Sequence, residues 1–280
     1  DQRSVLLLGG SVLTPAHGDI QALLSDRLRS RGWTNVVVDS VARLAHSSRD
    51  SRFKFQTITS SYDAVVFYHG INETRANHCP PSVYRDDNGH YAYYEMLNVY
   101  DRHRHTTPIS AIPYTVDYAY HRWKQVLLPR RYVPLDAAPP GLWLKYGTDV
   151  KTERAFASQV RAIADLAEAR GAVLVLATFA YHVPDNYTRA AFDAHALDYG
   201  GHTSPIELWG TPASVVKGIQ THNDIVRTIA GERDGAQLAD LERVIPKRGD
   251  YFDDVCHLSP TGCILFSDSL ADVLSRSLPR

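Results

Sequence analysis

The feature that most constrains this chain is a regular alternation between short apolar runs and longer segments with helical spacing. Each run has the length of a buried strand, and the segments between them place apolar residues three or four positions apart, as one face of a helix does. Strands separated by helices pair in parallel and lie between two layers of helices. We therefore expect an α/β fold with five parallel strands, at 5–8, 36–38, 64–68, 172–177 and 236–241.

Several of the expected helices have recognisable ends. Gly32 and Gly171 follow helical patterns and are predicted to end them, because glycine adopts a left-handed backbone at little cost. Thr152 is predicted to cap the helix that Gly171 ends, and Pro212 to begin the next one.

Polar residues follow two of the strands and precede the last helix. Ser11 ends a Gly9-Gly10-Ser11 turn behind the first strand, Asn72 follows the third, and Asp254 stands three residues before His257. Open α/β sheets place their sites beyond the carboxyl ends of the strands. These four side chains are therefore expected to lie together.

The residue types indicate a serine hydrolase. Ser11 becomes a nucleophile when a base removes its proton, and His257 is the predicted base. An Asp placed three residues earlier can bind Nδ1 of the imidazole and leave Nε2 facing the serine. Asn72 is a predicted donor to the negative oxygen that forms when an ester carbonyl is attacked. We expect Ser11, His257, Asp254 and Asn72 to be catalytic, with no metal ion and no cofactor.

These motifs, in this order, resemble those of the SGNH (GDSL-like) hydrolases. The family's Gly-Asp-Ser block is matched by Gly9-Gly10-Ser11 and its Gly-x-Asn-Asp block by Gly70-Ile71-Asn72-Glu73, with Gly and Glu in place of the two aspartates. Its Asp-x-x-His block is matched in full. The resemblance implies a flavodoxin-like parallel sheet flanked by helices, with long insertions.

The resemblance also implies an oxyanion hole. Its donors would be the backbone N–H groups of Ser11 and Ala45 and the side-chain amide of Asn72. Ala45, after the second strand, stands where the family has a glycine. Alanine keeps the N–H group, but it takes a positive φ less readily than glycine. Residues at or near these motifs and at the start of a later insertion are predicted to bind substrate: Gly70, His46, Tyr181 and His182.

Two stretches break the regular alternation within what we expect to be a single domain over 1–280. Residues 74–150 and 181–211 are rich in Tyr, His and Trp, and both leave from carboxyl ends of strands. Long segments without regular periodicity are usually binding loops or lids. We expect both to overhang the site, with their aromatic side chains forming either a small core of their own or a platform for substrate.

The composition of the chain bears on which partners it binds and in which compartment it works. A net charge of −1 with interspersed signs gives no indication of nucleic-acid binding, and the longest apolar runs are too short to span a membrane. The chain begins at Asp1 and runs straight into a strand, so a removed leader and an extracytoplasmic location are expected. Cys79, Cys256 and Cys263 allow one disulfide at most, and free thiols are an equal alternative.

The function expected from the sequence is a serine esterase that hydrolyses a carbohydrate O-acetyl group or a small acyl ester. Two alternatives stay open. One is an O-acyltransferase that uses the same residues and passes the acyl group to a sugar hydroxyl. The other is a non-catalytic carbohydrate-binding domain that kept the fold.

Overall fold

Five parallel strands form one sheet in the order β2-β1-β3-β4-β5. This order is that of flavodoxin-like folds, so the predicted fold class is confirmed. The computed structural model describes residues 2–133 and 137–278; residues 134–136 of the first insertion and residues 1, 279 and 280 lie outside them. The strands are β1 (Arg3–Gly9), β2 (Val36–Ser40), β3 (Ala64–Tyr68), β4 (Val173–Ala177) and β5 (Ala236–Ala239).

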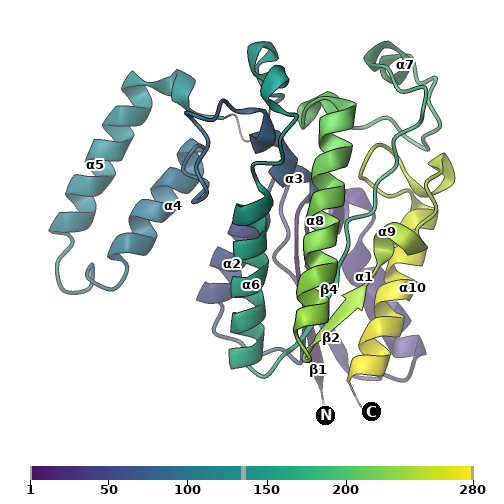
Figure 1. Cartoon of the computed structure of the whole chain (residues 1–280). Coiled ribbons are helices and arrows are strands. Elements are labelled where there is room, and N and C mark those ends of the chain that lie inside the picture. Colours follow the sequence, from purple (N-terminus) through teal and green to yellow (C-terminus); the bar gives the residue numbers. More distant parts are fainter. Residues whose placement is uncertain (1, 134–136, 279–280) are drawn as a thin grey trace.

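The central strands β1, β3 and β4 are buried on both faces, which is why they contain continuous apolar runs, whereas Leu238 in the edge strand β5 is 38% exposed. Along β1, Val5 and Leu7 join one core cluster while Leu6 and Leu8 join the other, and all four are fully buried. One face is covered by two helices and the other by three (Figure 1). These are α1 (Ile20–Ser30) and α10 (Pro260–Ser277) on the first face, and α2 (Ser48–Thr57), α6 (Glu153–Ala169) and α8 (Pro212–Glu232) on the second.

The helix ends predicted from local signals are found where expected, and only one capping contact is absent. Gly32 and Gly171 have positive φ angles of 95° and 67° just beyond α1 and α6, and Pro212 begins α8, as predicted. Thr152 is the N-cap residue of α6, but its side chain makes no capping hydrogen bond. Its hydroxyl instead lies 3.0 Å from Oδ1 of Asn77 and 2.9 Å from Nε2 of His222. None of the described helices is long and apolar enough to cross a membrane.

The remaining elements are short and lie mainly in the loops. The α-helices among them are α3 (Ile71–Thr74), α7 (Arg189–Asp193) and α9 (Leu241–Val244). The 3₁₀ turns are η1 (Ser11–Leu13), η2 (Pro15–His17), η3 (Arg75–His78), η4 (Pro129–Arg131), η5 (Gly141–Tyr146), η6 (Ile206–Leu208) and η7 (Gly249–Tyr251).

The first insertion differs from the irregular loop that the sequence led us to expect. It contains two helices, α4 (Ala92–His103) and α5 (Ile112–Leu127), which form an antiparallel hairpin (Figure 1). The hairpin lies beside α2 at the edge of the molecule, with α4 on the inner side and α5 on the outer side. The aromatic side chains of α5 therefore do not overhang the carboxyl ends of the strands.

Polar contacts hold the two helices of the hairpin together. The side chain of Glu95 in α4 is almost fully buried and accepts hydrogen bonds from Lys124, Gln125 and Tyr132. Burial alone would raise the pKa of Glu95, but these three donors together lower it below the ordinary range. The hairpin therefore depends on the negative charge of this carboxylate.

This dependence predicts that acid loosens the hairpin. Because the pKa of Glu95 is lower in the folded state than in the unfolded state, its contribution to stability is complete above about pH 5 and is lost as the pH falls below the ordinary Glu pKa of about 4.3. Hydrogen–deuterium exchange, corrected for its intrinsic pH dependence, should show α5 losing protection before α6. Glu95→Gln should reduce that pH dependence and leave the part that Asp117 contributes through its pairs with Arg102 and His103. Equal loss from both helices in the unmodified protein would contradict this account.

Candidate functional site

The four predicted catalytic side chains come from segments far apart in the sequence, and three of them form one hydrogen-bonded chain. Nε2 of His257 lies 2.9 Å from Oγ of Ser11, and Nδ1 of His257 lies 2.7 Å from Oδ2 of Asp254. Ser11 begins η1 at the end of β1, while the other two residues lie between η7 and α10. All three are buried, with exposed fractions of 8%, 3% and 0% for Ser11, His257 and Asp254.

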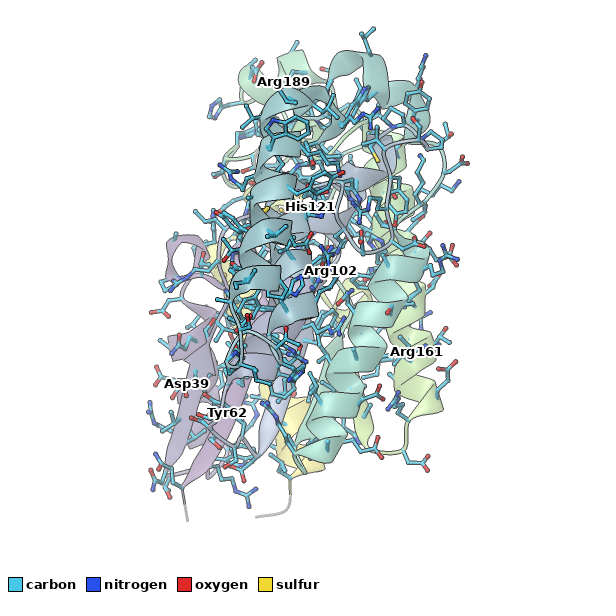
Figure 2. The ribbon with its side chains drawn as sticks, turned by 90° about the vertical axis from the view of Figure 1, so that its left-hand side faces the viewer. Asp39, Tyr62, Arg102, His121, Arg161 and Arg189 are labelled. Carbon is cyan, nitrogen blue, oxygen red and sulfur yellow. The ribbon has the colours of Figure 1, made fainter. Side chains whose placement is uncertain are left out.

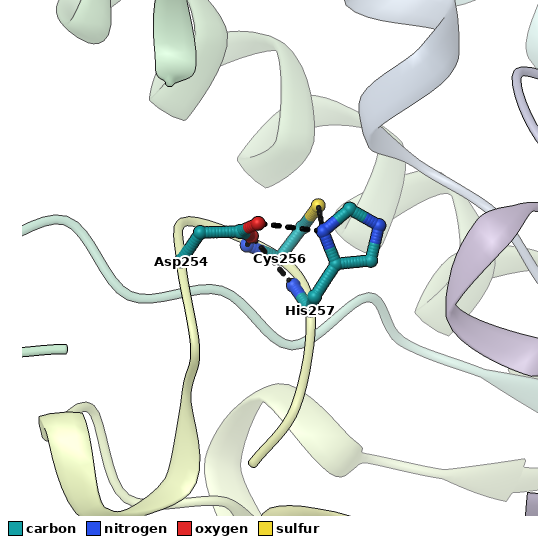
Figure 3. Close-up of side chains that lie close together, drawn as sticks. All are labelled: Asp254, Cys256 and His257. Carbon is teal, nitrogen blue, oxygen red and sulfur yellow. Dashed lines mark hydrogen bonds and ion pairs between the residues drawn. The ribbon is translucent and has the colours of Figure 1, made fainter. Parts of the chain in front are cut away.

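The carboxylate of Asp254 is surrounded by donors. Its Oδ1 accepts hydrogen bonds from the backbone N–H groups of Cys256 and His257, at 2.9 and 2.8 Å, while Oδ2 faces Nδ1 of the imidazole (Figure 3). A buried charge is tolerated only when it is paired in this way. Since an ionised carboxylate only accepts, Nδ1 carries the proton and Nε2 presents its lone pair to Ser11.

Cys256 lies beside this pair, so three residue types that can bind metals are close together. Its Sγ is 3.7 Å from Nδ1 of His257, and Asp254, Cys256 and His257 could all offer ligand atoms (Figure 3). Burial, together with the charge of Asp254, raises the pKa of the thiol, which disfavours the thiolate that binds metals. Nδ1 is also occupied by Asp254. The donor set fits a hydrogen-bonded triad better than a metal site. All three cysteines are free, which excludes a disulfide among them.

A second histidine covers His257, and nothing in the sequence pointed to it. The ring of His17, at the end of η2, stacks on His257 with 3.8 Å between centroids and 16° between planes. Burial, and to a smaller extent the neighbouring His257, lowers the pKa of His17. A neutral His17 shields one face of His257 from water without adding a charge.

The side-chain amide of Asn72 is held from both ends. Its Nδ2 donates to the carbonyl of His46 at 2.8 Å, and its Oδ1 accepts from the indole N–H of Trp209 at 2.9 Å. The indole therefore fixes which end of the amide is the donor. The second N–H of Nδ2 is left for another acceptor. Trp209 is 4% exposed and comes from the second insertion, where the sequence showed only an aromatic residue.

Close approach to this amide explains the glycine at position 10. A Cβ on Gly10 would lie 2.9 Å from Nδ2 of Asn72 and 3.1 Å from the carbonyl oxygen of His46. The Ser11 turn and the Asn72 amide are therefore in van der Waals contact. An aspartate at this place, as in the family block, would require this local packing to shift.

Ala45 occupies the conformation that favours glycine. Its φ is +60°, one of few positive values at non-glycine residues. The loop that carries it is tied to α3, since Oε1 of Glu73 accepts a hydrogen bond from the N–H of Ser48 at 2.6 Å. Among the residues that the structure describes, no acceptor is recorded for the backbone N–H groups of Ser11 and Ala45. Three potential donors, these two N–H groups and Nδ2 of Asn72, thus come from the segments that follow β1, β2 and β3.

The residues predicted to bind substrate are less closely grouped than the predicted catalytic residues. Gly70 lies beside Asn72, and its carbonyl accepts from Nδ1 of His222. His46 contributes its carbonyl to the site, whereas its imidazole turns to Lys54. Tyr181 and His182 line a separate cavity of about 590 Å³ together with Pro184, Val216 and Lys247, and neither Ser11 nor His257 belongs to its lining. Substrate contact by these four residues stays a prediction.

The two insertions stand in different relations to the site. The second one reaches it, through Trp209 at Asn72 and through Gly200, whose N–H donates to the carbonyl of Phe252 close to Asp254. The first one contacts the segment that follows Ala45. There the hydroxyl of Tyr94 lies 2.7 Å from Oγ of Ser47 and also donates to Asp50. Of the two, the second is better placed to cover a substrate.

The fold is similar to the folds of several solved ester hydrolases. An acetyl xylan esterase superposes with a TM-score of 0.52 at 14% identity, covering 96% of this chain and 98% of the other. A GDSL-like lipase from Bacteroides thetaiotaomicron gives 0.51 at 12%, covering 99% and 89%. An acylhydrolase described as putative, from Bacteroides fragilis, gives 0.53 at 12%, covering 99% and 88%. No family model and no curated protein sequence matches the chain. At these identities the similarity shows the fold, and it is the fold that the SGNH resemblance implied.

The strained alanine leads to a stability prediction. Ala45→Gly should raise the free energy of unfolding by up to about 1 kcal/mol, because relief of the left-handed strain outweighs the greater freedom of glycine in the unfolded chain. The matched control is Ala157→Gly within α6, where the same replacement should cost about 1 kcal/mol. Urea denaturation of the three proteins measures both changes. Equal destabilisation by both replacements would show that φ at Ala45 is not a source of strain.

Proposed function

We propose that the chain is a carboxylic ester hydrolase of the SGNH type. The observation that carries the proposal is the continuous hydrogen-bonded chain from Ser11 Oγ through His257 to Asp254. An ordinary structural serine does not need a buried imidazole whose far nitrogen is fixed by a buried carboxylate. The GDSL-like lipase and acetyl xylan esterase folds found by comparison support the same reading.

The mechanism follows from the positions of these groups. His257 Nε2 takes the proton as Ser11 Oγ attacks the ester carbonyl, and Asp254 stabilises the imidazolium that results. The oxyanion is stabilised by Asn72 Nδ2 and by the N–H groups of Ser11 and Ala45. The tetrahedral intermediate collapses when His257 returns the proton to the leaving alcohol. A water molecule then attacks the acyl-serine by the same steps in reverse, which releases the acid.

The substrate we propose carries a short acyl group, such as an acetyl ester on a carbohydrate. Ser11 and Asn72 are each only 8% exposed, so the site in this conformation admits a small group rather than a long chain. Two of the similar folds belong to acetyl xylan esterases, which favours the same choice. A panel of p-nitrophenyl acetate, butyrate and octanoate tests it, with acetate expected to turn over fastest. Highest turnover of octanoate would exclude a short-chain site.

Ser11→Ala should abolish ester hydrolysis while the protein stays folded, because it removes only the nucleophilic oxygen. Labelling by a fluorophosphonate probe should disappear with it. The control is Ser267→Ala, which truncates another buried serine, in α10, and should keep full activity. If the unmodified protein neither reacts with the probe nor releases acetate, the chain is a binding domain. If acetyl release requires a sugar acceptor, it is an acyltransferase.

Trp209→Phe should lower kcat roughly tenfold with little change in KM, because it removes one hydrogen bond that orients the Asn72 donor and keeps the ring packing. Asn72→Ala should lower kcat by about 100- to 1,000-fold. In the Asn72→Ala background, Trp209→Phe should have no further effect, which a purely structural tryptophan would not show. Trp33→Phe, at a buried tryptophan in the core, is the matched control.

A further inference from the structure

Helix α5 has its polarity reversed relative to an ordinary surface helix. Its outward face is an unbroken apolar strip, here called the α5 stripe, and its most exposed members are Ile112, Val126 and Val116 at 73%, 71% and 64%. Residues spaced three and four apart along a helix share one face. The full α5 stripe comprises Ile112, Val116, Ala119, Tyr120, Trp123, Val126 and Leu127.

The inward face of α5 is polar and committed to α4. Asp117 pairs with Arg102 at 2.8 Å, and the amide of Gln125 donates to the carbonyl of Ala92 at 2.9 Å. His121, labelled with Arg102 in Figure 2, lies 3.1 Å from Oε1 of Glu95. Turning the apolar face inward would break all of these contacts. The helix is therefore held with its stripe toward solvent.

No described element of this chain covers the stripe. Figure 2 looks onto this side of the molecule, with α5 nearest the viewer. Beyond the stripe itself, Ile109 ahead of α5 is 89% exposed and Leu128 behind it is 39% exposed. Contiguous apolar surface of this extent marks an interaction site.

The charge of the surrounding segment indicates what kind of partner the α5 stripe binds. Residues 102–131 contain six Arg or Lys and one Asp, a formal net charge of +5 in a chain whose total is −1. Asp117 is paired with Arg102, and Lys124 is paired with Glu95 of α4. Over the whole hairpin, residues 92–131, three acids leave a formal net charge of +3. Arg122 and Arg131 are exposed beside and beyond the stripe. An apolar helix face containing Trp and Tyr, on a segment with this excess of cations, has the chemistry that binds anionic lipid surfaces.

We propose that the α4–α5 hairpin docks the protein on an anionic lipid surface through the α5 stripe. The helix would lie in the plane of the interface, with the stripe among the acyl chains and the cations at the headgroups. A second copy of the chain fits less well. It would bring the same excess of positive charge against the stripe.

Vesicle sedimentation tests the proposal with the whole chain. The protein should bind vesicles of phosphatidylcholine mixed with phosphatidylglycerol, bind pure phosphatidylcholine much more weakly, and be released by high salt. Val116→Ser with Trp123→Ser should weaken binding at least about tenfold. Arg122→Gln with Arg131→Gln should weaken it roughly tenfold on the anionic vesicles alone.

Matched controls separate this surface from the rest of the protein. Val244→Ser with Ile264→Ser removes two exposed apolar side chains elsewhere and should leave binding unchanged. Ser11→Ala should bind vesicles as the unmodified protein does, so a failed esterase assay does not affect this test. Absence of binding, or equal binding to both kinds of vesicle, would overturn the proposal. A lipid-free dimer that Val116→Ser with Trp123→Ser dissociates would overturn it in favour of a second copy.

Discussion

The site depends on a negative charge that has no contact with water. The carboxylate of Asp254 is stable there because two backbone N–H groups and one imidazole nitrogen donate to it. Those same bonds shape the turn between Asp254 and His257 and set the direction of the ring. Since α1 and α10 pack side by side on one face of the sheet, this turn meets the loop after β1, and the two ends of the chain complete one site.

Where the oxyanion is proposed to form, a neutral group is held from two directions. The amide of Asn72 lies between the carbonyl of His46 and the indole of Trp209, so loops that follow β2 and β4 both determine its orientation. Glu73 fastens the loop of Ala45 to α3 through the N–H of Ser48. Ser11, Ala45 and Asn72 follow three different strands, β1, β2 and β3, so their relative positions depend on the order of the strands.

The strands, the fold class and the grouping of Ser11, Asn72, Asp254 and His257 were predictable because each rests on a local pattern. A strand buried on both faces is an apolar run, and the carboxyl ends of parallel strands meet at one edge. His17 and Trp209 were missed because their contacts join positions distant in sequence, and no spacing rule marks them. Helix α5 was missed because its apolar residues point away from the core and its buried face consists of polar and aromatic side chains.

The methyl group of Ala45 restricts the direction of a backbone N–H group that is proposed to bind the oxyanion. A glycine at this place would sample both signs of φ, and its N–H would swing with them. Alanine has a narrow left-handed region, so at φ +60° its N–H direction is set within a few tens of degrees. The loop bears this strain in the resting protein. In the mechanism proposed above, this donor would therefore be preorganised, and little rearrangement would be left for the moment when charge develops on a bound carbonyl.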